Sequence, residues 1–116
     1  MYSSFRDLQV WQTGMDLTMK IYKITKLFSN TDYALASQMQ RAAVSIPSNI
    51  AEGHGRGSNK EFQRFLSIAN GSCSELQTQL LLCERIGYLA REQTKEALLM
   101  TERIGKMLFA LSNSLN

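Results

Sequence analysis

Apolar residues recur every three or four positions along four long stretches of the sequence, and the only proline is Pro47. This spacing puts apolar side chains on one side of an α-helix, and no stretch shows the period of two expected of a strand. We therefore expect helices at about residues 5–28, 32–52, 59–87 and 91–114. Their connections are short, so neighbouring helices should run antiparallel. The sequence predicts an all-α protein, an antiparallel up-down-up-down four-helix bundle, with residues 1–116 as one domain.

Local signals mark the ends of these helices. Ser4 is a predicted N-cap for the first helix. Ser58 and Glu61 have the spacing of a capping box before the third, and Gly87 is a predicted C-cap after it. Pro47 lies inside the second helix and removes one backbone donor. We expect the polar residues around it, Ser45, Ser48 and Asn49, to compensate for part of that loss.

The first helix has two apolar faces. We interpret one as its core stripe, formed by Leu8, Trp11, Met15, Met19 and Tyr22. A helix at the edge of a monomeric bundle needs only one such face, and large exposed apolar patches are uncommon on monomers. The second face, with two residues of the last helix, is therefore a candidate oligomer interface: Val10, Leu17, Ile21, Ile24, Phe28, Leu98 and Phe109. The third helix adds a smaller apolar set, Ile68, Leu82 and Ile86. The alternative is a first helix buried on both sides within one chain.

The chain is mildly basic, with a net charge of +3. Such a charge permits nucleic acid as a partner without requiring it. A glycine-rich turn at residues 53–57 leads into the third helix, where free backbone amides favour anions. The candidate phosphate contacts are Arg41, Arg56, Lys60, Arg64, Lys20 and Lys23. The alternative interpretation is that these side chains only solvate the surface.

The sequence offers little chemistry for catalysis. Its one histidine, His54, is expected to be a solvated turn residue, and Cys73 and Cys83 are expected to be reduced core residues. No metal-ligand cluster and no activated nucleophile is recognisable, so we expect no enzyme, no metal and no cofactor. Residues 1–7 lack the pattern of a secretion signal, and no apolar run is long enough to span a membrane. These features predict a cytoplasmic protein with no membrane partner.

Several motifs together resemble a known family. The longest is Ser45-Ile46-Pro47-Ser48-Asn49-Ile50-Ala51-Glu52-Gly53, preceded by Arg41-Ala42-Ala43. Others are Phe5-x-x-Leu8-x-Val10-Trp11-Gln12, Gly55-Arg56-x-Ser58-x-Lys60-Glu61-Phe62, Phe65-Leu66-x-Ile68-Ala69 and Gly87-Tyr88-Leu89. Across nearly its whole length the chain resembles the S23-like proteins encoded within intervening sequences of bacterial 23S ribosomal RNA genes. The accessory variability proteins of diversity-generating retroelements look like relatives.

The resemblance implies a four-helix bundle that assembles as a homopentamer with a central channel. It also implies binding of RNA or DNA, and in the retroelement relatives a reverse transcriptase as protein partner. Family members often carry two basic residues before Ala42-Ala43, whereas this chain has Gln40-Arg41. That departure and the modest charge weaken the case for nucleic-acid binding, and they favour the ribosomal-insert branch over the retroelement branch. Two functions remain open, an oligomer that binds nucleic acid through phosphate contacts and a protein-interaction scaffold.

Overall fold

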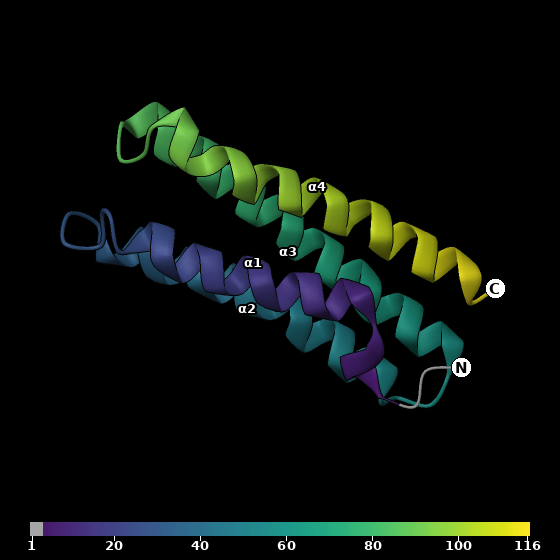
Figure 1. The fold of residues 1–116 in the computed structure, drawn as a ribbon. Coiled ribbons are helices and arrows are strands. Elements are labelled where there is room, and N and C mark those ends of the chain that lie inside the picture. Colours follow the sequence, from purple (N-terminus) through teal and green to yellow (C-terminus); the bar gives the residue numbers. More distant parts are fainter. Residues whose placement is uncertain (1–3) are drawn as a thin grey trace.

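The computed structural model describes residues 4–116, in which four helices and no strand are found. They are α1 (Gln9–Thr25), α2 (Tyr33–His54), α3 (Asn59–Ile86) and α4 (Arg91–Ser114), preceded by a short 3-10 helix, η1 (Phe5–Asp7) (Figure 1). The all-α prediction is confirmed. The first three residues of the expected domain, and of the segment inspected for a secretion signal, lie outside the described residues.

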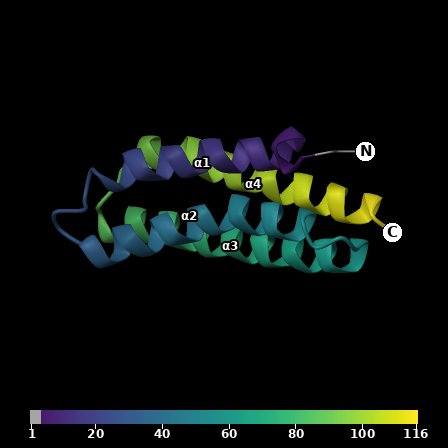
Figure 2. The ribbon, with the colours of Figure 1, turned by 90° about the horizontal axis from the view of Figure 1, so that it is seen from below.

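The helices form an elongated antiparallel bundle of 44 × 20 × 19 Å. Both α1 and α3 contact α2 and α4, whereas neither diagonal pair of these helices is in contact. In cross-section the helices therefore lie at the corners of a square, in the order α1, α2, α3, α4. Figure 2 shows α1 and α4 along one side of the bundle and α2 and α3 along the other. The predicted up-down-up-down arrangement follows from this order and from the short connections.

The predicted helix ends are close to those observed, with two informative differences. Ser4 accepts a hydrogen bond from the Arg6 amide and caps η1, so the α-helix begins later, at Gln9. At the start of α3 the Ser58 hydroxyl accepts from the Glu61 amide at 3.1 Å, but the Glu61 side chain turns to Arg64, so only half of the capping box forms. Gly87 ends α3 in the left-handed region, as expected of a C-cap.

The orientation of α1 corrects the sequence interpretation. The face assigned to an oligomer interface is buried within the single chain, and it consists of Val10, Leu17, Ile21, Ile24 and Phe28. The presumed core stripe is largely outside, with Met15 41%, Met19 61% and Tyr22 44% exposed. Leu98 is half-buried against the core, so only Phe109, at 70% exposure, has the expected surface position.

Gly14 explains why this face of α1 turns inward. It lies at helical spacing among Val10, Leu17 and Ile21, and it is buried beneath α2. A Cβ atom built on Gly14 would lie 3.4 Å from Ile46 and 3.5 Å from the Pro47 ring. Glycine on a helix face permits such a close approach of a neighbouring helix. The larger residues at the corresponding positions of the other face, Met15 and Met19, would not permit it.

The carbonyl group freed by Pro47 is satisfied from α1 rather than from α2. In an α-helix the missing Pro47 amide would have bonded to the Ala43 oxygen. The Thr18 hydroxyl donates to that oxygen at 3.1 Å and shares its proton with the Gly14 oxygen at 2.8 Å. The expectation that Ser45, Ser48 and Asn49 would compensate is therefore wrong for this group. Without Thr18, the buried Ala43 carbonyl would lack a partner, which is costly.

This assignment predicts the stability of a valine variant. Thr18→Val keeps the side-chain shape and removes the donor, so we expect the free energy of unfolding in urea to fall by about 1–3 kcal/mol. The matched control is Thr13→Val, since Thr13 donates only to Gln9 within its own helix. Equal losses in the two variants would contradict the role of the hydrogen bond between the helices.

Candidate functional site

The six candidate phosphate contacts lie on two parts of the surface. Lys20 and Lys23 are on α1 and Arg41 is on the neighbouring α2, where Arg41 lines the same hollow as Tyr22. Arg56, Lys60 and Arg64 surround the turn between α2 and α3. Arg41 and the end of α2 are 13 residues apart, about 20 Å at 1.5 Å per residue. The structure therefore does not bring the six residues into one patch.

At the α2–α3 turn both arginines are engaged by carboxylates. Arg56 Nε lies 3.2 Å from Glu52 Oε2, and Arg64 Nε lies 3.2 Å from Glu61 Oε2. The hydrogen bond from Arg64 lowers the pKa of the Glu61 carboxyl group. Both guanidinium groups also lie over the ring of Phe65, at 4.9 and 4.5 Å from its centre. These arginines cover an apolar ring and neutralise two glutamates, which leaves less charge for a phosphate.

The other four candidate cations differ in whether they form an ion pair. Lys20 Nζ lies 3.1 Å from Glu96 Oε1 and links α1 to α4. Lys23, Arg41 and Lys60 are exposed and form no ion pair within residues 4–116. Arg41 stands beside a shallow hollow of about 430 Å³ between α1 and α2, which is also lined by Tyr22 and Val44. Of the six predicted contacts, these three keep their full charge for a ligand.

The Ser45–Gly53 motif lies within α2 and contacts α3. The Ser45 and Ser72 hydroxyl groups lie 2.8 Å apart across the two helices. The Asn49 amide donates to the Ser45 carbonyl at 2.8 Å and to its hydroxyl at 2.9 Å, which holds Ser45 in place. At the end of the motif Gly53 is buried against α3, where a Cβ atom would lie 2.6 Å from Phe65 Cβ. The motif therefore has structural contacts along most of its length.

His54 differs from its expected role as a solvated turn residue. It is the last residue of α2 and is partly buried between aromatic rings. Its ring lies edge-on to Phe5, at 6.5 Å between ring centres, and to Phe62, at 5.9 Å. The turn begins two residues later than predicted, so His54 belongs to the aromatic end of the bundle. Within residues 4–116 no three His, Cys, Asp or Glu side chains gather as metal ligands.

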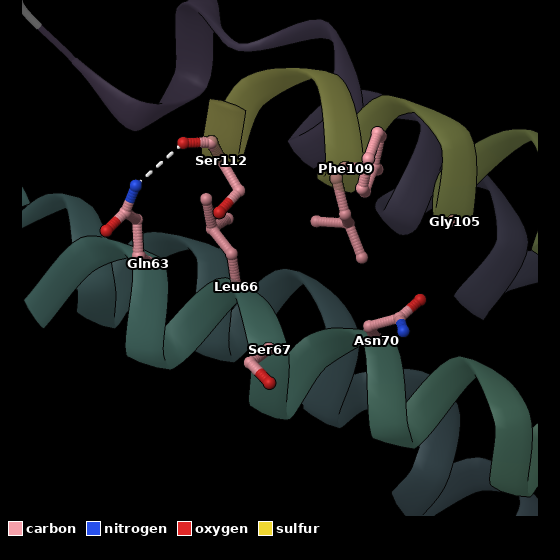
Figure 3. Close-up of a pocket in the computed structure, with 8 residues that line it drawn as sticks. Gln63, Leu66, Ser67, Asn70, Gly105, Phe109 and Ser112 are labelled. Atoms are coloured by element: carbon pink, nitrogen blue, oxygen red, sulfur yellow. Dashed lines mark hydrogen bonds between the residues drawn. The ribbon is translucent and has the colours of Figure 1, made fainter. Parts of the chain in front are cut away.

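A hollow of about 150 Å³ lies between α3 and α4 (Figure 3). The Gln63 amide donates to the Ser112 carbonyl at 2.8 Å at one end, and Asn70 and Phe109 lie toward the other. Amide, hydroxyl and apolar side chains line it. Since none of these groups ionises near neutral pH, the cavity contains no general base or activated nucleophile.

Both cysteines are free and buried, which confirms their expected place in the core. Burial raises the pKa of the Cys73 thiol to about 12 and that of the Cys83 thiol to about 11. The Cys83 thiol donates to the sulfur of Met39 at 3.6 Å. Protonated, enclosed thiols of this kind are poor nucleophiles and poor metal ligands.

The surface also carries apolar residues that the candidate sites did not include. Ile68, Leu82 and Ile86 of α3 are 41–49% exposed, which confirms that this extra set lies outside the core. Val44 of α2 is 40% exposed beside Tyr22. The helical spacing of apolar residues predicts the α3 set correctly. On α1 the same spacing wrongly places the exposed residues Met15, Met19 and Tyr22 in the core.

Sequence and structure comparisons agree with this architecture. The family described as 23S rRNA-intervening sequence protein matches residues 6–110. The chain belongs to this family. A crystal structure of a protein of unknown function from the S23 ribosomal protein family of Bacteroides thetaiotaomicron is similar, with a TM-score of 0.83 and 26% sequence identity. The alignment covers 89% of this chain and 97% of that one. No curated protein matches the sequence.

These findings confirm the 23S rRNA-intervening sequence family and its four-helix fold. They do not extend to the retroelement relatives. None of the described helices of this family member is both long enough and apolar enough to span a membrane.

The contact at Gly53 predicts a second stability difference. Gly53→Ala places a methyl group against Phe65 Cβ, which cannot move without its helix, so we expect a loss of about 1–3 kcal/mol in the free energy of unfolding. Gly71→Ala is the control, because Gly71 lies within α3 with no atom within 4 Å of the added Cβ. There alanine should stabilise the helix by about 0.5–1 kcal/mol. A neutral Gly53→Ala would contradict this close contact.

Proposed function

We propose that this protein acts without catalysis, as a homo-oligomer that binds nucleic acid through phosphate contacts. The observation that carries the proposal is the amount of apolar surface on one chain. Eight large apolar side chains on α1, α2 and α3 are between 40% and 61% exposed, namely Met15, Met19, Tyr22, Val44, Ile68, Leu81, Leu82 and Ile86. Monomeric proteins rarely expose so many in neighbouring positions, and association would cover them.

Charge supports the nucleic-acid part of the proposal. Each chain has a net charge of +3, so the five copies implied by the resemblance would carry about +15. Lys23, Arg41 and Lys60 have no carboxylate partner in the described part of the chain and are the best contacts for phosphate. The description of the family names 23S rRNA, so a structured RNA is the first ligand to test. Contacts to phosphates should give strong salt dependence and little sequence specificity.

The second candidate function is a protein-interaction scaffold. It is favoured by the ion pairs of Arg56 and Arg64 with Glu52 and Glu61, because these pairs reduce the charge at the α2–α3 turn. A scaffold would keep its protein partner after nuclease treatment, whereas an oligomer that binds nucleic acid would lose its ligand.

Salt titrations of binding to structured RNA, single strands and duplex DNA test the proposal. We expect affinity to fall steeply with salt, and the slope of log K against log salt to decrease by about 0.7–0.9 for each phosphate contact removed. A variant with Lys23, Arg41 and Lys60 all changed to Gln should bind weakly with a reduced slope. The control changes Lys95, Arg103 and Lys106 of α4 to Gln, which removes the same charge.

Light scattering should give both variants the mass of the parent protein, so that a change in affinity reflects contacts rather than assembly. Equal weakening in both variants would overturn the assignment to Lys23, Arg41 and Lys60. No binding of any of the three nucleic acids at low salt would overturn the nucleic-acid function itself.

A further inference from the structure

A pocket lies at the end of the bundle where α2 ends and α3 begins. Its volume of about 440 Å³ is within the range of about 300–1,000 Å³ that is typical of ligand sites. The described helices α2 and α4 occupy opposite corners and are not in contact, so the pocket lies between their ends, beside the first turn of α3. Figure 2 shows the start of α3 and the end of α4 at this end of the bundle. Three helices and the α2–α3 turn thus line one pocket.

Apolar and aromatic side chains line much of this pocket. His54 at the end of α2 and Phe62 in the first turn of α3 contribute rings, and Leu111 and Leu115 contribute side chains from the end of α4. The His54 and Phe62 rings meet edge to face at 88°, with 5.9 Å between their centres. Phe5 of η1 packs edge-on against the His54 ring from another direction. A flat apolar ligand placed here would meet rings that are already held in position.

Two polar side chains at the start of α3 also line the pocket. The Ser58 hydroxyl accepts from the Glu61 amide at 3.1 Å, which leaves the hydroxyl proton available to donate. The Asn59 side-chain nitrogen donates to the Leu115 carbonyl at 3.0 Å, which leaves the side-chain oxygen available to accept. Proteins recognise the edge of an unpaired nucleobase with such donors and acceptors, next to an apolar surface for its flat face. The pocket offers both kinds of contact.

A cation without an ion pair lies next to the pocket. Lys60 follows Asn59 in the first turn of α3, is exposed and pairs with no carboxylate within residues 4–116. The two carboxylates of this turn, Glu52 and Glu61, pair with its two arginines rather than with Lys60. A nucleotide carries a phosphate close to its base. One nucleotide can therefore occupy the pocket with its base and contact Lys60 with its phosphate.

We propose that this pocket receives an unpaired nucleobase of a single-stranded nucleic acid, whose phosphate contacts Lys60. The inference rests on the proposed nucleic-acid function and adds a base-binding site to its phosphate contacts. A base in a duplex is paired and stacked, so it does not enter the pocket, whereas a base in a single strand or a loop turns outward and packs against side chains. Single strands and loops should therefore bind more tightly than duplexes. Preference among the bases should be small, because every base has a flat face.

NMR of the His54 ring tests the pocket directly, because His54 is the only histidine in the sequence and its signals are unambiguous. Titration with adenosine monophosphate or uridine monophosphate at constant pH should shift the ring signals in a saturable way. Ribose phosphate carries the phosphate without a base, so it should leave these signals unchanged. No shift with either nucleotide, or an equal shift with ribose phosphate, would overturn the base pocket.

A variant that fills the pocket tests the same site with a longer ligand. Ser114 is exposed at the end of α4 and lines the pocket, so Ser114→Trp places an indole ring there without changing the core. We expect the affinity for a single-stranded RNA to fall about 5- to 150-fold, the effect of losing one stacked base. The slope of log K against log salt should stay the same, because the phosphate contacts remain. Asn113→Trp is the control, since Asn113 is exposed on the same turn but does not line the pocket.

Duplex binding separates this inference from the proposed function. Ser114→Trp should bind duplex DNA as tightly as the parent protein does, since paired bases do not enter the pocket. If the parent and Ser114→Trp bind single-stranded RNA equally, the pocket assignment is wrong and the phosphate contacts stand. Equal weakening by Asn113→Trp would also overturn the pocket. If the parent binds no nucleic acid at low salt, the pocket and the proposed function are both overturned.

Discussion

The approach of α1 to α2 at Gly14 determines much of this structure. Gly14 lets the Pro47 ring and Ile46 lie directly on α1, and Thr18 one turn later bonds to the carbonyl that Pro47 frees. Proline inside a helix is normally unfavourable because it removes a hydrogen bond. Here the Thr18 hydroxyl of the neighbouring helix supplies the donor, and it can do so only when α1 has the rotation about its axis that is seen in this structure. The unfavourable effect of the proline is therefore offset in that one orientation. That rotation buries Leu17 and Ile21 and leaves Met15, Met19 and Tyr22 outside.

The surface of the molecule follows from the same rotation. With this face of α1 outside, apolar side chains flank α2 on both sides, while the charged residues of α4 occupy the opposite corner. The hydrogen bond between Ser45 and Ser72 and the close contact of Gly53 with Phe65 set α3 against α2 in the same way. The long motif in α2 thus accounts for how its two neighbours are placed. Its polar residues Ser45 and Asn49 take part in these structural contacts.

Much of the fold was predictable from the sequence, because helical periodicity and capping residues are local properties. The choice between the two faces of α1 was not, since both have the same period and similar apolar content. Gly14 was the available signal, because a glycine among core-facing positions marks a close approach. The availability of each cation also depended on the fold. Arg64 pairs within its own helix, but Lys20 pairs with Glu96 of α4, a partner 76 positions away in the sequence.

Hydroxyl-radical footprinting of the protein at its assembled concentration tests the central claim most directly, namely that this rotation of α1 creates a surface covered by another copy. In one chain Met19 is 61% exposed and Phe109 is 70% exposed. The account predicts that Met19 and Tyr22 are protected on assembly and become reactive on dilution, while Phe109 reacts at both concentrations. Met19 that stays reactive in the assembled protein would contradict it.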